Sequence, residues 1–172
     1  MDEQELSRRF PEGGEECLTA AVARYGQPLL RYCHHVLCDY HEAQDAVQNT
    51  FLRAWDRRAQ FRAGSNLSAW LYKLAYHACV DGLRARRRQL FASPPPERGT
   101  DYIGPELRAA LEGLSPQERG LVFSRVMEGM CYEELSEVYG ASPAALRKRY
   151  ERAKKKLARS LAGAKEGKEE AS

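Results

Sequence analysis

Two polar side chains lie one helical turn apart in the run from Asp45 to Trp55, and together they could bind a partner through a carboxylate and an amide. Helical spacing puts the apolar residues of this run in one stripe, which leaves Asp45, Gln48 and Arg53 on the outer face. The stripe consists of Ala46, Val47, Phe51, Leu52, Ala54 and Trp55. We expect the stripe to be buried. A solvated helix face carries the same polar residues, so their role depends on the rest of the chain.

Aromatic, amide and cationic side chains collect in the loop Phe61–Asn66 and along the helix that follows it. Bases that leave a stacked duplex are held by aromatic faces, snug pockets and cationic grooves. Half-buried packing accounts for Tyr72 and Tyr76 equally well, and we expect Trp70 in the core. Arginines at the end of this helix also suit the helix dipole without any ligand. The candidate contacts to an unstacked strand are Phe61, Arg62, Ser65, Asn66, Tyr72, Lys73, Tyr76, His77 and Arg84.

A turn between two predicted helices near the C-terminus has the residues of a helix-turn-helix motif. Tyr132–Tyr139 is predicted to be a short helix, Gly140 opens the turn, and Pro143 starts a long basic helix that should run to about Leu161. A glycine in the turn, followed by a capping serine and a proline, is what such a motif requires. Its second helix enters the major groove, where cations contact phosphates and the first residues reach base edges. The candidates for this role are Ala144, Arg147, Lys148, Arg149, Arg152 and Lys155.

Cysteines and histidines cluster in the run from Cys33 to His41, where thiolate and imidazole groups could bind a metal. Two features argue against such a site: Cys33 falls on the apolar stripe of its helix, and Cys38 lies where that helix ends. We expect His34 and His35 to point outward. The prediction is therefore no metal and no cofactor, with a thiol or zinc sensor built on Cys33 and Cys38 as an alternative.

Helices must position these groups, and the pattern along the chain predicts an all-α protein. The polar residues 1–14 are expected to form a disordered acidic tail. A helical pattern starts at Glu15, is interrupted at Gly26-Gln27-Pro28 by a kink or short turn, and then resumes. A capping-box pattern at Asp39 starts the next helix, which should run to about Arg58.

The chain divides into two small helical domains. Residues 15–88 form the first as a bundle of three or four helices. Residues 89–105 contain Pro94-Pro95-Pro96 and few apolar anchors, which predicts a flexible linker. Residues 106–162 form the second domain, with the helix-turn-helix motif, and residues 163–172 form a disordered tail.

The composition sets further bounds on function. The chain has 172 residues and a net charge of only +3, which by itself implies no polyanionic partner. No apolar run approaches the ~20 residues that a membrane helix needs, and no signal peptide is found, so we expect a cytoplasmic protein with no membrane insertion. The cysteines are odd in number and form no C-x-x-C pair, which suits reduced thiols. No catalytic triad, paired-carboxylate or glycine-rich phosphate motif occurs, so we do not expect an enzyme.

Both halves of the chain resemble one family, the group 4 (extracytoplasmic function, ECF) sigma factors of the sigma-70 family. The resemblance covers roughly residues 15–161, with family region 2 followed by region 4. Two matches in the family's order are more specific than a helix-turn-helix motif alone. The residues that carry the resemblance are 39–55, 61–65 and 69–77 in the first half, and 114–119, 132–137 and 147–157 in the second.

The resemblance implies a role for each group of candidates. Asp45, Gln48 and Arg53 would bind core RNA polymerase, on the coiled coil of its largest subunit. The candidates in loop Phe61–Asn66 and the helix after it would hold the non-template strand of the minus-10 promoter element. The basic helix after Pro143 would bind the minus-35 element as a duplex. Many relatives carry an asparagine in the place of His77, so their minus-10 base preference is not carried over.

We therefore expect an RNA polymerase sigma factor that directs promoter-specific transcription initiation under the control of an anti-sigma factor. Its two domains either occlude each other in the free protein or are clamped together by the anti-sigma factor. An alternative is a stand-alone helix-turn-helix transcriptional regulator, whose first domain serves dimerisation or sensing. That alternative predicts duplex binding without polymerase and indifference to Asp45.

Overall fold

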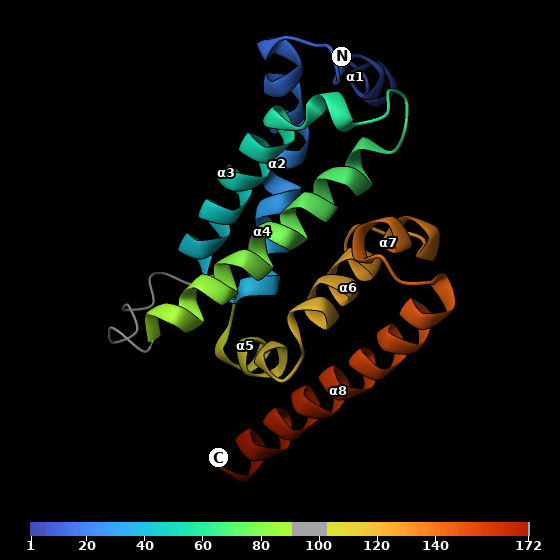
Figure 1. Ribbon diagram of the computed structural model, residues 1–172. Helices are drawn as coiled ribbons and strands as arrows, with labels where there is room; N and C mark the ends of the chain where they lie inside the picture. The colour runs from blue at the N-terminus through green and yellow to red at the C-terminus, as the bar shows by residue number, and fades with distance from the viewer. Residues whose placement is uncertain (91–102, 172) are drawn as a thin grey trace.

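The computed structural model describes residues 1–90 and 103–171, and over those residues the chain is helical without a β-strand (Figure 1). This confirms the all-α prediction. None of the helices in these ranges is long and apolar enough to cross a membrane. The elements are α1 (Glu3–Arg9), α2 (Glu15–Leu37), α3 (Tyr40–Asp56), the 3-10 turn η1 (Arg58–Gln60), α4 (Leu67–Leu90), α5 (Pro105–Glu112), α6 (Pro116–Val126), α7 (Tyr132–Tyr139) and α8 (Pro143–Glu170).

Two helices of the first half begin where the sequence supplies a cap. Asp39 Oδ1 accepts a hydrogen bond from the Glu42 amide at 2.9 Å and starts α3, and Asn66 Oδ1 accepts one from the Ala69 amide at 2.9 Å and starts α4. The Glu42 carboxylate does not complete a capping box, because it accepts a hydrogen bond from Arg86 of α4 at 3.2 Å. This contact ties the start of α3 to the end of α4.

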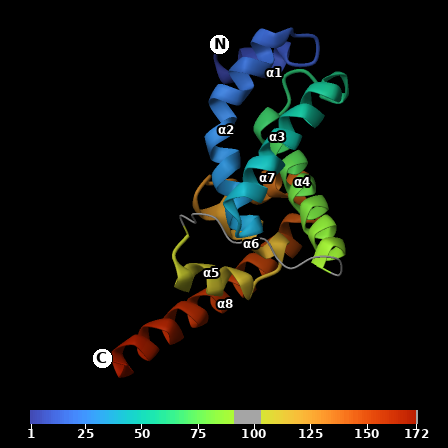
Figure 2. The same cartoon turned by 90° about the vertical axis from the view of Figure 1, so that its left-hand side faces the viewer.

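The first half is a bundle of α2, α3 and α4 (Figure 2). Its core contains Leu29 and Tyr32 from α2, Phe51 from α3, and Leu71 and Tyr72 from α4, all of them buried. Helical spacing of these apolar residues explains why each helix turns one face inward.

In the second half, α7 and α8 form the predicted helix-turn-helix. Gly140 has a φ of 65°, a left-handed conformation that a glycine adopts without strain, and Ser142 Oγ accepts a hydrogen bond from the Ala145 amide at 3.2 Å to cap α8. Helix α8 ends at Glu170 rather than near Leu161. Residues 163–170, predicted to be disordered, therefore continue the basic helix.

The N-terminal segment also differs from its prediction as a disordered tail, because residues 3–9 form helix α1. Leu6 and Phe10 explain the difference. They lie four residues apart on one face, and each is only 1% exposed in the core of the first half. Their burial holds a segment whose remaining residues are mostly polar.

Helix α2 runs without a break through Pro28, where the sequence predicts a kink or short turn. Tyr25 before the proline and Leu29 after it are both buried, so core packing keeps the two parts of α2 in line. Most of the predicted linker, 89–105, lies outside the described residues. Its first two residues belong to α4, and Pro105 starts α5.

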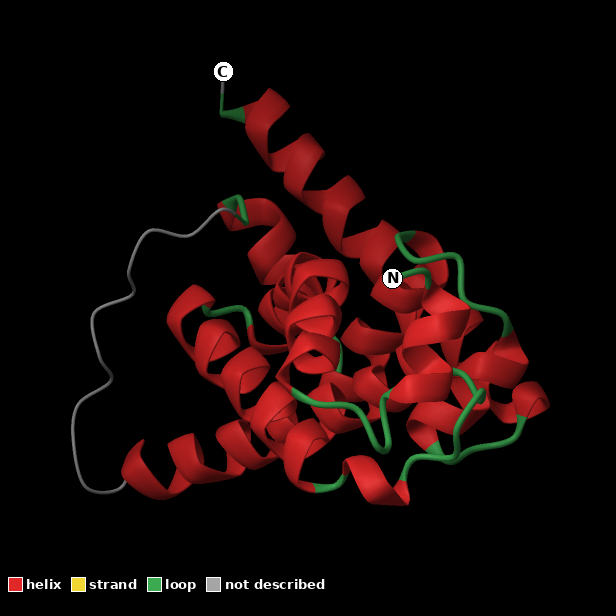
Figure 3. Cartoon of the chain, turned by 90° about the horizontal axis from the view of Figure 1, so that it is seen from above, coloured by secondary structure: helices red, strands yellow, loops and turns green. Residues whose placement is uncertain are grey.

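The two halves share one core, and Figure 3 shows their helices gathered into one body. Helix α6 packs on α2, and α7 packs on α4. The hydroxyls of Tyr32 and Tyr139 form a hydrogen bond of 2.9 Å across the junction. Helix α6 comes so close that a Cβ atom on Gly120 would lie 2.6 Å from the Tyr139 hydroxyl and 2.8 Å from the Tyr32 hydroxyl. The junction therefore requires a glycine at this position.

A buried arginine joins the halves at the C-terminal end of α2. Arg119 of α6 is 8% exposed and donates through Nε to the Val36 carbonyl at 2.7 Å. Its Nη1 donates to the carbonyls of Leu111 and Leu114 at 3.2 and 2.9 Å. The negative end of the α2 dipole also favours a cation here.

Replacing Arg119 by methionine would remove the guanidinium that donates to the carbonyls of Val36 and Leu114. We expect Arg119→Met to lower the free energy of unfolding by ~2–4 kcal/mol. Arg119→Lys should recover less than half of the lost free energy of unfolding. A single ammonium group lacks the planar guanidinium that reaches the α2 carbonyl and the Leu114 carbonyl together. Urea unfolding followed by circular dichroism measures both variants. An unchanged midpoint for Arg119→Met would contradict this account.

Two histidines predicted to point outward lie instead at the packed end of α2. His34 is 6% exposed, and the half-buried His35 has its ring centroid 4.6 Å from that of Phe123 of α6. The prediction was wrong because the second half covers this face of α2. Burial lowers the pKa of both imidazoles, and the positive charge of Arg108 lowers the pKa of His34 further.

These lowered pKa values make stability depend on pH. The unfolded chain binds protons at the ordinary histidine pKa of about 6.5, whereas the folded chain binds them only at lower pH. Stability is therefore fully present above about pH 6.5 and is lost as the pH falls below it. We expect the free energy of unfolding to decrease from about pH 7 to about pH 5, and His34→Gln with His35→Gln to flatten most of that slope. Denaturant unfolding at several pH values measures it, and an unchanged slope in the double variant would contradict the assignment.

Candidate nucleic-acid interface

The carboxylate and amide predicted to bind a partner lie together on an apolar groove between α2 and α3. Asp45 and Gln48 are both exposed and line this groove of about 570 Å³. Phe51 and Trp55 line it from the same helix, and Leu30 lines it from α2. We call this surface the α2–α3 groove.

The rim of the α2–α3 groove exposes aliphatic side chains. Leu52 is 58% exposed and Val22 is 44% exposed. The prediction that Leu52 is buried was wrong, because the apolar stripe of α3 is wider than the surface that neighbouring helices cover. Val22 was not predicted as a site residue, although it shares a helical face with Leu18, which also lines the groove. Exposed apolar surface beside polar side chains is typical of a protein-binding site.

Arg53, predicted to act with Asp45 and Gln48, is directed toward α4. Its guanidinium forms an ion pair with Asp81 at 2.9 Å, and Arg53 lines a second groove, between α3 and α4. The structure therefore brings Asp45 and Gln48 together on the α2–α3 groove and places Arg53 apart from Gln48.

A smaller pocket of about 330 Å³ lies beside residues 61–66, which we call loop 61–66. Arg62, Ser65 and Lys73 are exposed, and Asn66 is half-buried. Cations, a hydroxyl and an amide thus surround a space that could take one unstacked base. The predicted contacts that line this loop pocket are Phe61, Arg62, Ser65, Asn66 and Lys73.

Two of the predicted aromatic contacts are buried. Phe61 is 4% exposed, with its ring centroid 5.1 Å from that of Trp70. Tyr72 was predicted on the exposed side of α4 but is 1% exposed, because it packs edge-on against Tyr32 at 5.0 Å. Burial, and then the carboxylate of Glu128, raise the pKa of Tyr72. Neither ring offers a free face to a base in this arrangement.

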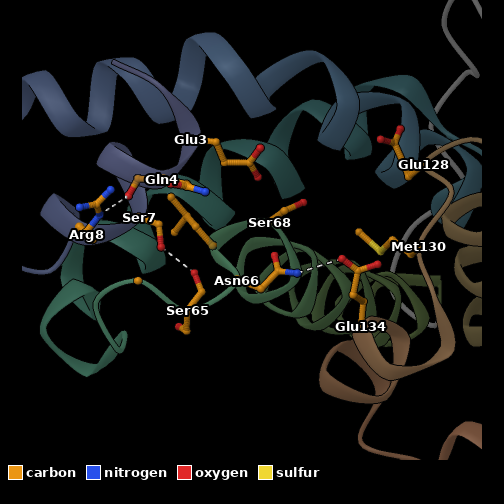
Figure 4. Close-up of a pocket in the computed structure, with 12 residues that line it drawn as sticks. Glu3, Gln4, Ser7, Arg8, Ser65, Asn66, Ser68, Glu128, Met130 and Glu134 are labelled. Atoms are coloured by element: carbon orange, nitrogen blue, oxygen red, sulfur yellow. Dashed lines mark hydrogen bonds between the residues drawn. The ribbon is translucent and has the colours of Figure 1, made fainter.

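Helix α7 covers the surface beside loop 61–66 (Figure 4). Asn66 Nδ2 donates to Glu134 Oε1 at 3.0 Å, and Glu137 of α7 lines the loop pocket. The ring of Tyr76 is half-buried against Tyr139, with centroids 5.0 Å apart. Carboxylates of α7 therefore stand beside these groups, and their bulk and charge disfavour a nucleic-acid strand here while the two halves are packed together. Two further predicted contacts, His77 and Arg84, are exposed.

The predicted duplex contacts lie on the outer side of α8. Leu146 and Ala153 are buried and seat the helix on the second half, which directs the cations outward. Arg149 is half-buried and donates to Gln117 Oε1 at 2.7 Å. The exposed candidates are Ala144, Arg147, Lys148, Arg152 and Lys155.

The cysteine and histidine cluster contributes side chains to the packing of the protein interior. Cys33 is buried, and Cys38 ends α2 with a φ of 55°, the left-handed conformation that favours glycine. All five cysteines are free thiols. Across residues 1–90 and 103–171, no group of three or more His, Cys, Asp or Glu side chains could hold a metal ion.

Family models match both halves of the chain. The model described as Sigma-70 region 2 matches residues 21–89. The model described as Sigma-70, region 4 matches residues 105–157.

Individual relatives give the same result. RNA polymerase sigma factor CarQ of Myxococcus xanthus is 30% identical over 159 residues, which cover 87% of this chain and 91% of CarQ. ECF RNA polymerase sigma factor SigG of Mycobacterium tuberculosis is 26% identical, and the match covers 81% of this chain but 47% of SigG, so this chain spans about half the length of that relative. The solved structure of the sigma factor RpoE in complex with the anti-sigma factor NepR from Bartonella quintana has a TM-score of 0.71 at 23% identity, and the match covers 84% of this chain and 96% of that one.

Proposed function

Because this chain belongs to the extracytoplasmic function group of the sigma-70 family, we propose that it directs promoter-specific transcription initiation as a dissociable subunit of bacterial RNA polymerase, in the cytoplasm. The observation that carries the proposal is the α2–α3 groove. Its exposed aliphatic rim and its polar pair, Asp45 and Gln48, have the composition of a protein-binding surface. A helix of the polymerase, laid with its apolar stripe in the groove, is the partner that this shape favours.

The two other surfaces bind different elements of the promoter. Loop 61–66 and the start of α4 take an unstacked base of the minus-10 element, supported by the amide of Asn66 and the cations of Arg62 and Lys73 that line the loop pocket. The outer face of α8 takes the minus-35 element as a duplex, supported by its exposed cations. Chemical steps belong to the polymerase.

The free chain is closed, because α7 covers the surface that would hold the minus-10 strand. The contact of Asn66 with Glu134 must break before loop 61–66 can bind DNA. We therefore assign to polymerase binding the separation of the two halves. An anti-sigma factor, of the kind bound to the relative RpoE, would act against that separation.

The proposal is tested by co-elution of the purified chain with bacterial core RNA polymerase. We expect a stable complex for the wild type and roughly 10- to 100-fold weaker binding for Asp45→Ala with Gln48→Ala, because interface centres carry most binding energy. Asp56→Ala is the control, since Asp56 is an exposed carboxylate of the same helix that does not line the α2–α3 groove. No complex for the wild type, combined with tight, salt-sensitive duplex binding, would favour the stand-alone regulator.

A further inference from the structure

We propose that Ser7 is a positioning residue for minus-10 recognition: through it, helix α1 holds loop 61–66 in the shape that presents the loop to an unstacked base. The inference rests on the proposed function, because the role of the loop in minus-10 binding is itself proposed. It assigns a function to a segment that the sequence predicted to be a disordered tail.

Two hydrogen bonds join Ser7 to the loop. Ser7 Oγ donates to the Ser65 carbonyl at 2.6 Å (Figure 4). The Gly64 amide donates to the Ser7 carbonyl at 3.3 Å. Ser7 is 4% exposed, so its hydroxyl has exchanged water for the Ser65 carbonyl. Removing one partner of such a bond leaves the other partner unsatisfied, which costs more than the bond contributes on average.

The sequence frees the Ser7 carbonyl for this contact. In a longer helix that oxygen would accept from the amide four residues later, but that residue is Pro11, which has no N–H. The Gly64 amide takes its place. Gly64 has a φ of 77°, a left-handed conformation in which a residue with a side chain is strained. Pro11 thus leaves the Ser7 carbonyl free, and Gly64 supplies the amide that binds it.

Aromatic packing holds α1 beside the loop. The ring of Phe10, 1% exposed, lies edge-on with its centroid 6.2 Å from that of Phe61 and 6.1 Å from that of Trp70. Phe61 is the first residue of the loop, and Trp70 follows the loop in α4. Helix α1 is in turn fixed to α2, because the Tyr25 hydroxyl donates to the Glu3 carboxylate at 3.1 Å. The loop connects α3 to α4, and α1, a helix from another part of the chain, supports it.

Contacts within the loop are local. The Ser65 amide and hydroxyl bond to the Arg62 carbonyl at 3.1 and 2.7 Å, which closes a turn but does not orient it on the protein. Ser65 is followed by Asn66, whose side chain caps α4 and lines the loop pocket. Groups that bind an extruded base must be held to within ~0.5 Å of the productive geometry. Loss of the Ser7 hydroxyl would let the Ser65 carbonyl, and with it Asn66, take other positions.

The test uses holoenzyme reconstituted from core polymerase and this chain. Holoenzyme selects binders from a duplex DNA library randomised over the minus-10 and minus-35 segments, and the selected DNA is sequenced. For Ser7→Ala we expect base preference at minus-10 to fall about tenfold, which corresponds to ~1.4 kcal/mol of discrimination, while minus-35 preference is unchanged. Equal amounts of assembled holoenzyme are compared, so a change in core binding does not enter the result.

Ser136→Ala is the matched control, because Ser136 Oγ donates to the Ala141 carbonyl at the same distance, 2.6 Å, within the helix-turn-helix. It should leave the minus-10 preference intact. Gly64→Ala provides a second variant that does not remove a buried group, since Gly64 is exposed and only its φ is unsuited to alanine. We expect it to lower minus-10 preference as Ser7→Ala does.

Unchanged minus-10 preference in Ser7→Ala and Gly64→Ala, with a wild type that selects both elements, overturns this inference alone. An equal loss at minus-10 and minus-35 also overturns it, because that is the result of general destabilisation. A wild-type chain that forms no holoenzyme, or selects no sequence, overturns the proposed function and the inference with it.

Discussion

Replacing Leu52 by aspartate should weaken binding of the chain to core RNA polymerase roughly 30- to 100-fold (~2–3 kcal/mol) without lowering its stability. Leu52 is 58% exposed, so the carboxylate remains in water in the free chain. In the complex the partner would cover it, and a buried carboxylate without a partner is costly. Equilibrium titration of labelled chain with core polymerase measures the effect, and thermal unfolding checks the stability.

Two neighbouring positions on α2 give a matched pair for this experiment. Val22 lines the α2–α3 groove, whereas Ala23 is exposed but does not line it. Val22→Asp should weaken binding as Leu52→Asp does, and Ala23→Asp, which adds the same charge to the same helix, should not. Undiminished binding of Leu52→Asp, or an equal loss for Ala23→Asp, would contradict the assignment of the groove.

Replacing Gly120 by alanine should force the two halves of the free chain apart. The added methyl group would lie 2.6 Å from the Tyr139 hydroxyl and 2.8 Å from the Tyr32 hydroxyl, inside any permitted contact. Overpacking of this kind typically costs ~1–3 kcal/mol, which the junction between the halves can relieve by opening. We expect a larger radius of gyration in small-angle scattering for Gly120→Ala than for the wild type.

A rescue variant separates opening of the junction from damage to the second half. Tyr32→Phe with Tyr139→Phe removes both contacts shorter than 3.0 Å and leaves only Tyr32 Cε2 at 3.2 Å, which a small shift of the ring relieves. Added to Gly120→Ala, the two changes should restore the compact scattering profile. A wild-type profile that already matches an extended chain would contradict the closed state, and so would an unchanged radius in Gly120→Ala.

Local features of the fold could be predicted because they depend on neighbouring residues. Asp39 caps α3 and Asn66 caps α4 through hydrogen bonds to amides three residues later, so the sequence indicates where these helices begin. The helix-turn-helix follows from Gly140 and Ser142 in the same way. Helix α1 was not predicted, because the segment is polar apart from two buried residues, Leu6 and Phe10.

The arrangement of the halves could not be predicted, because it depends on residues far apart in the sequence. Tyr32 and Tyr139 are separated by 107 positions, and nothing local to either indicates that their hydroxyls meet. The same junction covers His35, which was predicted to point outward and packs on Phe123 of α6. Helical periodicity identifies an apolar face, but it does not tell whether a neighbouring helix, a partner or solvent covers that face.

The candidate site shows the same division. Asp45 and Gln48 share the α2–α3 groove because they lie one helical turn apart. Their spacing in the sequence is enough to predict this. The groove wall at Val22 comes from another helix and required the structure. The contact of Glu134 with Asn66 likewise joins the two halves across 68 positions. The closed state, with α7 beside loop 61–66, is therefore a property of the fold rather than of any motif.

The most direct test of the sigma-factor account is run-off transcription by purified core RNA polymerase on the randomised promoter library, with and without the chain. We predict transcripts that depend on the chain and that start at a fixed distance from two selected elements. Asp45→Ala with Gln48→Ala should strongly reduce them, and Asp56→Ala should not. Binding of the chain to duplex DNA without polymerase, with no transcript that depends on it, would contradict the account and identify a stand-alone regulator.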